Sequence, residues 1–141
     1  NQKSFKYTLS KFMQVRGADT IVAQGRKRKA RDPGFYAALE SRFGVPAGVI
    51  IAIHGMETAF GHFMGDSSVV SAITTANGDG RVDFYNQADA LASTANFLRQ
   101  KGWQPGVGYQ EGQGNFEVIK QWNAAGVYQK AIAIMGARID G

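Results

Sequence analysis

The chain contains no cysteine and only three prolines among 141 residues. The absence of cysteine excludes disulfide bonds, thiolate metal ligands and cysteine nucleophiles, and it leaves the compartment open. No run approaches the roughly 20 consecutive apolar residues that a membrane-spanning helix requires. Hydrophobic residues make up 44% of the chain and aromatic residues 11%, which is enough apolar material for a core. We therefore expect a single domain over residues 1–141.

Acidic residues are scarce in the first third of the chain. Residues 1–43 contain ten Lys and Arg against three Asp and Glu, whereas residues 44–141 contain six against eight. The densest basic stretch, at 26–31, favours a polyanionic partner such as nucleic acid, anionic lipid or a carboxylate-rich cell-wall polymer. A solvated helix end or loop is the simpler interpretation of the same stretch.

Apolar spacing predicts a mostly α-helical domain. No segment shows sustained two-residue alternation, and no repeat period is present. Asp32 and Pro33 are typical of a helix start, and Gly25, Gly44 and Gly102 are typical of helix ends. The predicted helices cover residues 10–24, 33–43, 46–60, 86–101, 115–122 and 125–139, the fifth of them capped by Asn115, with loops at 65–80 and 102–114.

The helix that begins at Pro46 is apolar on almost every side, so we expect it to be central. Its apolar run closes on one carboxylate, Glu57, flanked by Gly55 and Gly61. We expect burial there to raise the pKa of Glu57 toward neutrality and to make it a general acid. Glycosidases usually use two carboxylates, but the nearest one, Asp66, follows a glycine break. Glu57 acting alone as acid and then as base is the favoured hypothesis, and a capping or salt-bridged glutamate is the structural alternative.

The two histidines offer little for catalysis or metal binding. His54 shares a helix face with Glu57, and we expect its ring to be neutral or turned away, because a protonated ring would oppose an acid role for Glu57. His62 is interpreted as a surface residue. With two histidines and no cysteine, a zinc site is improbable.

The stretch from Asn77 to Asp83 resembles the middle of an EF-hand loop, with oxygen-bearing side chains at Asn77, Asp79 and Asp83 and glycines between them. The first and twelfth positions of such a loop fall on Thr75 and Asn86, where strong calcium sites have Asp and Glu. A turn without calcium is therefore favoured, and these three residues are weak metal candidates.

Trp122, Asn123 and Tyr128 place an aromatic ring, an amide and a phenol within seven residues. Sugars are often bound by such groups, because their C–H faces stack on rings while their hydroxyls bond to amides. Core packing for Trp122 and helix capping for Asn123 are the structural alternatives.

Four blocks of the sequence together resemble the lytic murein transglycosylase B family, glycoside hydrolase family 103. Their order along the chain is the family's order, which argues against a chance resemblance. The blocks are Phe-Gly-Val-Pro at 43–46 with Gly-Met-Glu-Thr at 55–58; Gly-Asp-Gly-Arg at 78–81; the stretch 89–98 with Gly-Trp at 102–103; and Asn-Phe at 115–116 with Trp122, Asn123 and Tyr128.

The resemblance implies a lysozyme-like helical domain that cleaves the MurNAc–GlcNAc β-1,4 bond of peptidoglycan without water and leaves a 1,6-anhydro-MurNAc end. Glu57 matches the family's single acid/base, and Trp122, Asn123 and Tyr128 match positions of its saccharide groove. No cofactor is required, although the block at 78–81 matches the family's EF-hand-like loop. The expected partners are peptidoglycan strands rather than nucleic acid. The expected location is the periplasm or cell envelope, with any membrane association in a segment before Asn1.

The chain also departs from the family pattern. Family members are roughly twice as long, and two stretches are missing, one after Thr75 and one between about 106 and 114. His54 stands where the family more often has an apolar or aromatic residue. Three hypotheses follow: a lytic transglycosylase, a non-catalytic glycan-binding module, and nucleic-acid binding through residues 26–31, whose affinity would fall steeply with salt.

Overall fold

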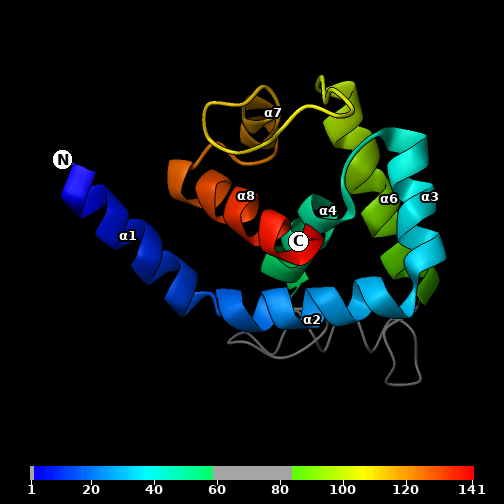
Figure 1. Ribbon diagram of the computed structural model, residues 1–141, viewed down its shortest axis with the longest axis horizontal. Coiled ribbons are helices and arrows are strands. Elements are labelled where there is room, and N and C mark those ends of the chain that lie inside the picture. The colour runs from blue at the N-terminus through cyan, green and yellow to red at the C-terminus, as the bar shows by residue number, and fades with distance from the viewer. Residues whose placement is uncertain (1, 59–83) are drawn as a thin grey trace.

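The computed structural model describes residues 2–58 and 84–141. Within these ranges the chain forms seven helices and no strand (Figure 1). The mainly α prediction is confirmed for this part of the chain. The helices are α1 (Gln2–Val15), α2 (Ala18–Arg31), α3 (Pro33–Phe43), α4 (Ala47–Thr58), α6 (Phe84–Gln100), α7 (Phe116–Trp122) and α8 (Gly126–Asp140).

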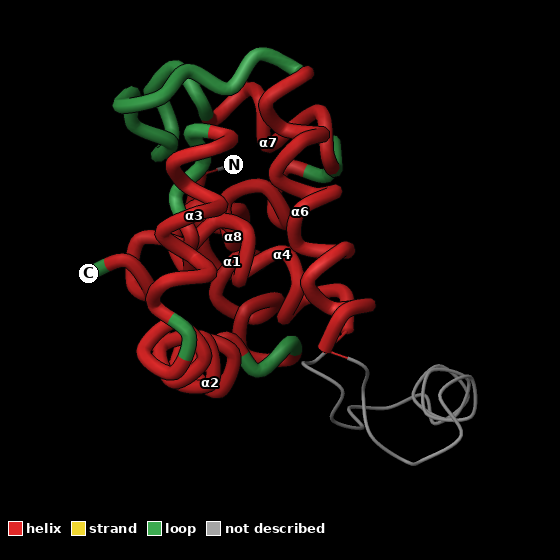
Figure 2. The backbone as a smooth tube through the Cα atoms, turned by 90° about the vertical axis from the view of Figure 1, so that its right-hand side faces the viewer, coloured by secondary structure: helices red, strands yellow, loops and turns green. Residues whose placement is uncertain are grey.

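The central helix is α4, as its sequence predicts. Nine of its twelve residues are buried, and it packs against α2, α3, α6 and α8. Figure 2 shows α4 within the body of the bundle, with α2 crossing at one end. Because the helix is apolar on nearly all sides, burial by several neighbours is the arrangement that removes most of its surface from water.

Glycines allow α2, α4 and α8 to approach closely. A Cβ at Gly48 of α4 would collide with the carbonyl oxygen of Gly136 on α8, and a Cβ at Gly25 of α2 would lie 2.8 Å from atoms of both Ile51 and Ile139. These three helices pack with their backbones close together. Small residues at their crossings are therefore a requirement of the fold.

The prediction of one helix over 10–24 that ends at Gly25 is wrong. The break lies earlier, at Gly17, whose φ of 70° is in the left-handed region. Helix α2 runs through Gly25 to Arg31. Gly25 is needed there for packing and does not end the helix, because Ile51 and Ile139 occupy the space that a side chain would need. The basic stretch 26–31 is accordingly the second half of α2.

Pro33 begins α3 as predicted, and Gly44 ends it with a φ of 75°. The side chains of Asp32 and Asn115, however, make no capping hydrogen bond. Asn115 is completely buried. Its amide accepts from the Gln104 N–H and donates to the carbonyls of Gln104 and Val107, each at 2.8 Å. It therefore organises the loop before α7.

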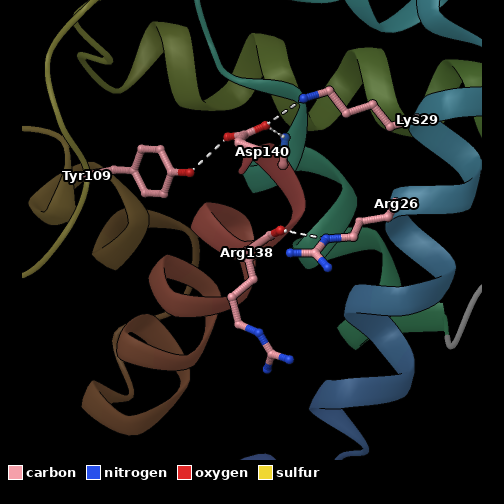
Figure 3. A network of polar contacts seen from close by, with 6 residues as sticks. Arg26, Lys29, Tyr109, Arg138 and Asp140 are labelled. Carbon is pink, nitrogen blue, oxygen red and sulfur yellow. Dashed lines mark hydrogen bonds and ion pairs between the residues drawn. The ribbon is translucent and has the colours of Figure 1, made fainter.

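The first turn of α4 is fixed by the last turn of α8 (Figure 3). Oδ1 of Asp140 accepts hydrogen bonds from the Gly48 N–H at 2.8 Å and from Lys29 Nζ at 3.2 Å. Its Oδ2 accepts from the Tyr109 hydroxyl at 2.8 Å. Burial, and then the nearby Asp140, raises the pKa of Tyr109. Asp140 therefore caps α4 from another helix and supplies the negative charge that a helix N-terminus favours.

Several predictions concern residues outside the described ranges. They are the last two residues of the helix predicted over 46–60, the 65–80 loop, His62 at the surface, the EF-hand-like residues Asn77, Asp79 and Asp83, and the missing stretch after Thr75.

Within the described residues, no single helix combines the length and apolarity needed to cross a bilayer. Helices α3 and α4, bent by 107° relative to each other, meet those criteria only as a pair.

Candidate active site

Glu57 lies in the last turn of α4, one residue before that helix ends at Thr58. Gly55 and Met56 are buried, but the Glu57 side chain is exposed. The expectation that the apolar helix buries this carboxylate is therefore wrong. Among the described residues, Glu57 is therefore an exposed carboxylate at the end of an otherwise buried helix.

Tyr128, in the first turn of α8, donates a hydrogen bond from its hydroxyl to Oε1 of Glu57 at 2.6 Å. The Tyr128 side chain is 6% exposed. Burial is the largest cause that raises the pKa of Tyr128, followed by the hydrogen bond to Glu57 and its charge. The phenol therefore stays protonated and remains a donor to the carboxylate.

Trp122, the last residue of α7, extends this arrangement. A side-chain hydrogen bond from Trp122 lowers the pKa of Tyr128, which opposes the effect of burial. The indole N–H is the only hydrogen-bonding group of a tryptophan side chain and can only donate. The Trp122 ring also meets Phe97 of α6 edge to face, with centroids 5.4 Å apart. Trp122 is thus partly a packing residue and partly a support for the phenol that holds Glu57.

Asn123 occupies the extended connection between α7 and α8, with φ −152° and ψ 117°. Its Oδ1 accepts a hydrogen bond from the Ala125 N–H at 2.9 Å. This contact closes the turn before α8 and is not a side-chain cap, because the N-cap of α8 is Ala125. Asn123 does stand at the C-cap position of α7, where its backbone N–H donates to the Ile119 carbonyl. The side chain is partly exposed, and a role in sugar binding stays a prediction.

Arg16, which the sequence analysis did not single out, contacts the backbone next to Glu57. It lies in the turn between α1 and α2, and its Nη2 donates to the carbonyl oxygen of Met56 at 2.5 Å. Its guanidinium stands over the Phe12 ring at 5.5 Å, and Phe12 meets Tyr128 edge to face at 6.5 Å. The sequence signal that could have identified Arg16 is an arginine at the end of an amphipathic helix, directly before a glycine.

The structure therefore brings three of the four predicted residues into one connected cluster: Glu57, Tyr128 and Trp122. Asn123 follows Trp122 directly but has its described hydrogen bond within its own turn. One cavity, of about 720 Å³, lies at the opposite end of α4 between α2, α3 and α8. None of the predicted site residues lines it, so it does not define the site.

Comparison with known families decides the reaction class. The family model described as the transglycosylase SLT domain matches residues 1–77 and 74–111. The chain belongs to this family. A search of curated proteins gives no match.

The transglycosylase SLT domain is a lysozyme-like helical fold, which agrees with the helical architecture and confirms the predicted fold class. Membership indicates a lytic transglycosylase that acts on peptidoglycan in general. Glu57 lies within the matched residues, whereas Trp122 and Tyr128 lie beyond them. The two matches overlap at 74–77. This stretch includes Thr75, after which a segment of the B family is expected to be missing, and that expectation stays a prediction.

His54 of this SLT domain stays neutral near neutral pH. Burial, followed by the charge of Arg28, lowers the pKa of His54 to about 4. A neutral ring was one of the two outcomes expected from the sequence. Its described electrostatic neighbour is Arg28 of α2, whereas the described neighbour of Glu57 is Tyr128 of α8.

No group of three His, Asp or Glu side chains within residues 2–58 and 84–141 is arranged to hold a metal ion. Asn77, Asp79 and Asp83 lie outside these ranges, so calcium binding at that loop stays a prediction. The chemistry that the described site offers is proton transfer. An exposed carboxyl group can reach a ligand while a buried phenol holds one of its oxygens.

Proposed function

We propose that this protein is a peptidoglycan lytic transglycosylase of the lytic murein transglycosylase B type, glycoside hydrolase family 103. It cleaves the MurNAc–GlcNAc β-1,4 bond and leaves a 1,6-anhydro-MurNAc end. The observation that carries the proposal is the placement of Glu57, exposed at the end of the central helix with one oxygen bound by Tyr128. Family membership supports the reaction class, and the sequence blocks around Glu57, Asp79, Trp103 and Trp122 support the finer assignment.

One carboxyl group suffices for both proton transfers. Protonated Glu57 gives its proton to the bridging oxygen as the bond from C1 of MurNAc to that oxygen breaks, and GlcNAc leaves with a hydroxyl group. The resulting carboxylate then accepts the proton of the C6 hydroxyl of MurNAc as O6 bonds to C1. The 1,6-anhydro ring is formed, Glu57 is protonated again, and neither water nor a cofactor is consumed.

The neighbouring side chains have supporting roles in this proposal. Tyr128 holds Oε1 of Glu57 at 2.6 Å, so the carboxyl group keeps one orientation through both steps. Trp122 and Asn123 are partly exposed and provide a ring face and an amide for the glycan. The proposed substrate supports the periplasm or cell envelope as the location in this proposal.

A comparison of Glu57→Gln with Glu40→Gln tests the proposal. Glu40 is an exposed glutamate of α3 beside the distant cavity, so its replacement controls for the loss of one surface charge. Wild type and Glu40→Gln should release 1,6-anhydro-muropeptides from purified sacculi, detected by mass spectrometry, whereas Glu57→Gln should bind sacculi and release none. Undiminished release by Glu57→Gln would remove Glu57 from the mechanism. Binding without any release by the wild type would favour the glycan-binding module.

A further inference from the structure

We infer that Arg16 is a positioning residue for the Glu57 carboxyl group, an inference that rests on the proposed function. Arg16 lies in the turn between α1 and α2, directly before the left-handed Gly17. Its Nη2 donates to the Met56 carbonyl oxygen at 2.5 Å. Met56 is the residue immediately before Glu57, so this contact holds the backbone from which the Glu57 side chain projects.

The Met56 carbonyl lies in the last described turn of α4, two residues before Thr58. The guanidinium of Arg16 donates to it and places positive charge toward the C-terminal end of that helix, where the helix dipole favours it. The side chain comes from a turn distant in sequence, so it also fixes α4 relative to α1.

Arg16 is joined to the partner of Glu57 as well. Its guanidinium stands over the Phe12 ring at 5.5 Å, and that ring meets the Tyr128 ring edge to face at 6.5 Å. The charge of Arg16 is one of the influences that lower the pKa of Tyr128, against the larger effect of burial. Arg16 is thus linked to both members of the Glu57–Tyr128 pair. It hydrogen-bonds the backbone next to Glu57, and it stacks on Phe12, whose ring contacts Tyr128.

Two other arginines make the same kind of contact away from this pair. Arg99 of α6 donates to the carbonyl of Arg42 in the last turn of α3 at 2.8 Å. Arg26 of α2 donates to the carbonyl of Arg138 in the last turn of α8, also at 2.8 Å (Figure 3). All three contacts tie a helix end to another element. Only Arg16 binds the residue next to Glu57, so Arg99 provides an internal control for a purely structural effect.

The test compares Arg16→Ala, Arg16→Lys and Arg99→Ala in thermal unfolding and in steady-state release of 1,6-anhydro products from soluble, uncrosslinked glycan strands. Arg16→Ala should lower kcat by about 100-fold, because a small misplacement of a reacting group has an effect of that size, while KM stays within about threefold. Arg16→Lys should recover part of kcat, since lysine keeps the charge and a donor but not the planar fork. Arg99→Ala should lose a similar amount of Tm and keep the wild-type kcat.

Two results would overturn the inference. One is a kcat for Arg16→Ala within twofold of wild type. The other is an equal fall in kcat for Arg16→Ala and Arg99→Ala when the two variants also lose the same amount of Tm. If Arg16→Ala does not fold, Arg16→Lys decides: a kcat lowered about threefold to tenfold at an unchanged Tm supports the inference, and a wild-type kcat overturns it. Failure of the proposed function is distinguishable, because the wild type itself would then release no anhydro product.

Discussion

The hydroxyl of Tyr128 lies 2.6 Å from Oε1 of Glu57 and joins the first turn of α8 to the last turn of α4. The opposite ends of the same two helices are joined by Asp140, which accepts from the Gly48 N–H and from the Tyr109 hydroxyl at 2.8 Å each. The central helix is therefore tied to α8 at both ends. The contact at one end includes the proposed acid, Glu57, and the contact at the other end, through Asp140, is structural.

Replacing Tyr128 by Phe should lower kcat by about 10- to 100-fold, because the carboxyl group loses the donor that orients it. The matched control is Tyr109→Phe, which loses the hydrogen bond to Asp140 and should keep its kcat. Each variant should lose about 1–2 kcal/mol of stability in denaturant unfolding. Equal kcat values for the two variants would contradict a role for Tyr128 at Glu57.

Stability should fall with acidification in a way that depends on His54. The folded-state pKa of His54 is lowered to about 4, whereas the unfolded value is about 6.5. The unfolded chain therefore binds a proton that the folded chain excludes, and the free energy of unfolding decreases as the pH falls from about 6.5 to about 4. The loss from this group is at most of order 3 kcal/mol.

Urea unfolding of wild type and His54→Gln across this pH range isolates the contribution of His54. His62 is present in both proteins, so its titration cancels in the difference. The difference in the free energy of unfolding between the two proteins should change by most of the loss expected from His54 between pH 7 and pH 4. If the free energies of unfolding of the two proteins changed equally with pH, His54 would not be the source of the pH dependence.

Gly48→Ala should lower the free energy of unfolding by about 3 kcal/mol or more. The added methyl group would collide with the Gly136 carbonyl and would lie 2.6 Å from Cγ of Asp140, which separates α4 from α8. The matched control is Gly34→Ala in α3, where no atom lies within 4 Å of the added carbon. That variant should be neutral or stabilised by about 0.5–1 kcal/mol. Equal stabilities by denaturant titration would contradict the close crossing.

Asn115→Ala should cost about 3 kcal/mol, because it leaves the polar backbone groups of Gln104 and Val107 without their partner in a buried loop. An exposed asparagine of α6, Asn96, provides the control, and its change to Ala should stay within about 0.5 kcal/mol. Chemical denaturation of the two variants measures both effects. A loss for Asn115→Ala as small as that for Asn96→Ala would show that the buried amide does not organise the loop.

Local sequence patterns predicted most of the helices. Apolar spacing and end signals gave α3 at its observed bounds, and α6, α7 and α8 within one or two residues. They also predicted that the helix carrying Glu57 is central. These features follow from neighbouring residues, whose effects can be read along the chain.

Features that depend on distant residues were missed. Gly25 is typical of a helix end, yet Ile51 and Ile139 pack on it within α2. The apolar residues before Glu57 predicted that its side chain is buried. Whether the end of α4 lies inside the core, however, depends on how far the helices packed against α4 extend. The partners of Glu57 and Met56 lie 71 and 40 residues away in sequence, so the hydrogen bonds of Tyr128 and Arg16 arise only from the packed fold.

Product analysis in ¹⁸O-labelled water tests the central claim, intramolecular attack assisted by Glu57, most directly. Purified glycan strands are digested in this solvent, and the new MurNAc ends are examined by mass spectrometry. The account predicts 1,6-anhydro-MurNAc ends that carry no ¹⁸O with the wild type, and no such ends with Glu57→Gln. Reducing MurNAc ends that carry one ¹⁸O would show that water is the nucleophile and would contradict the account.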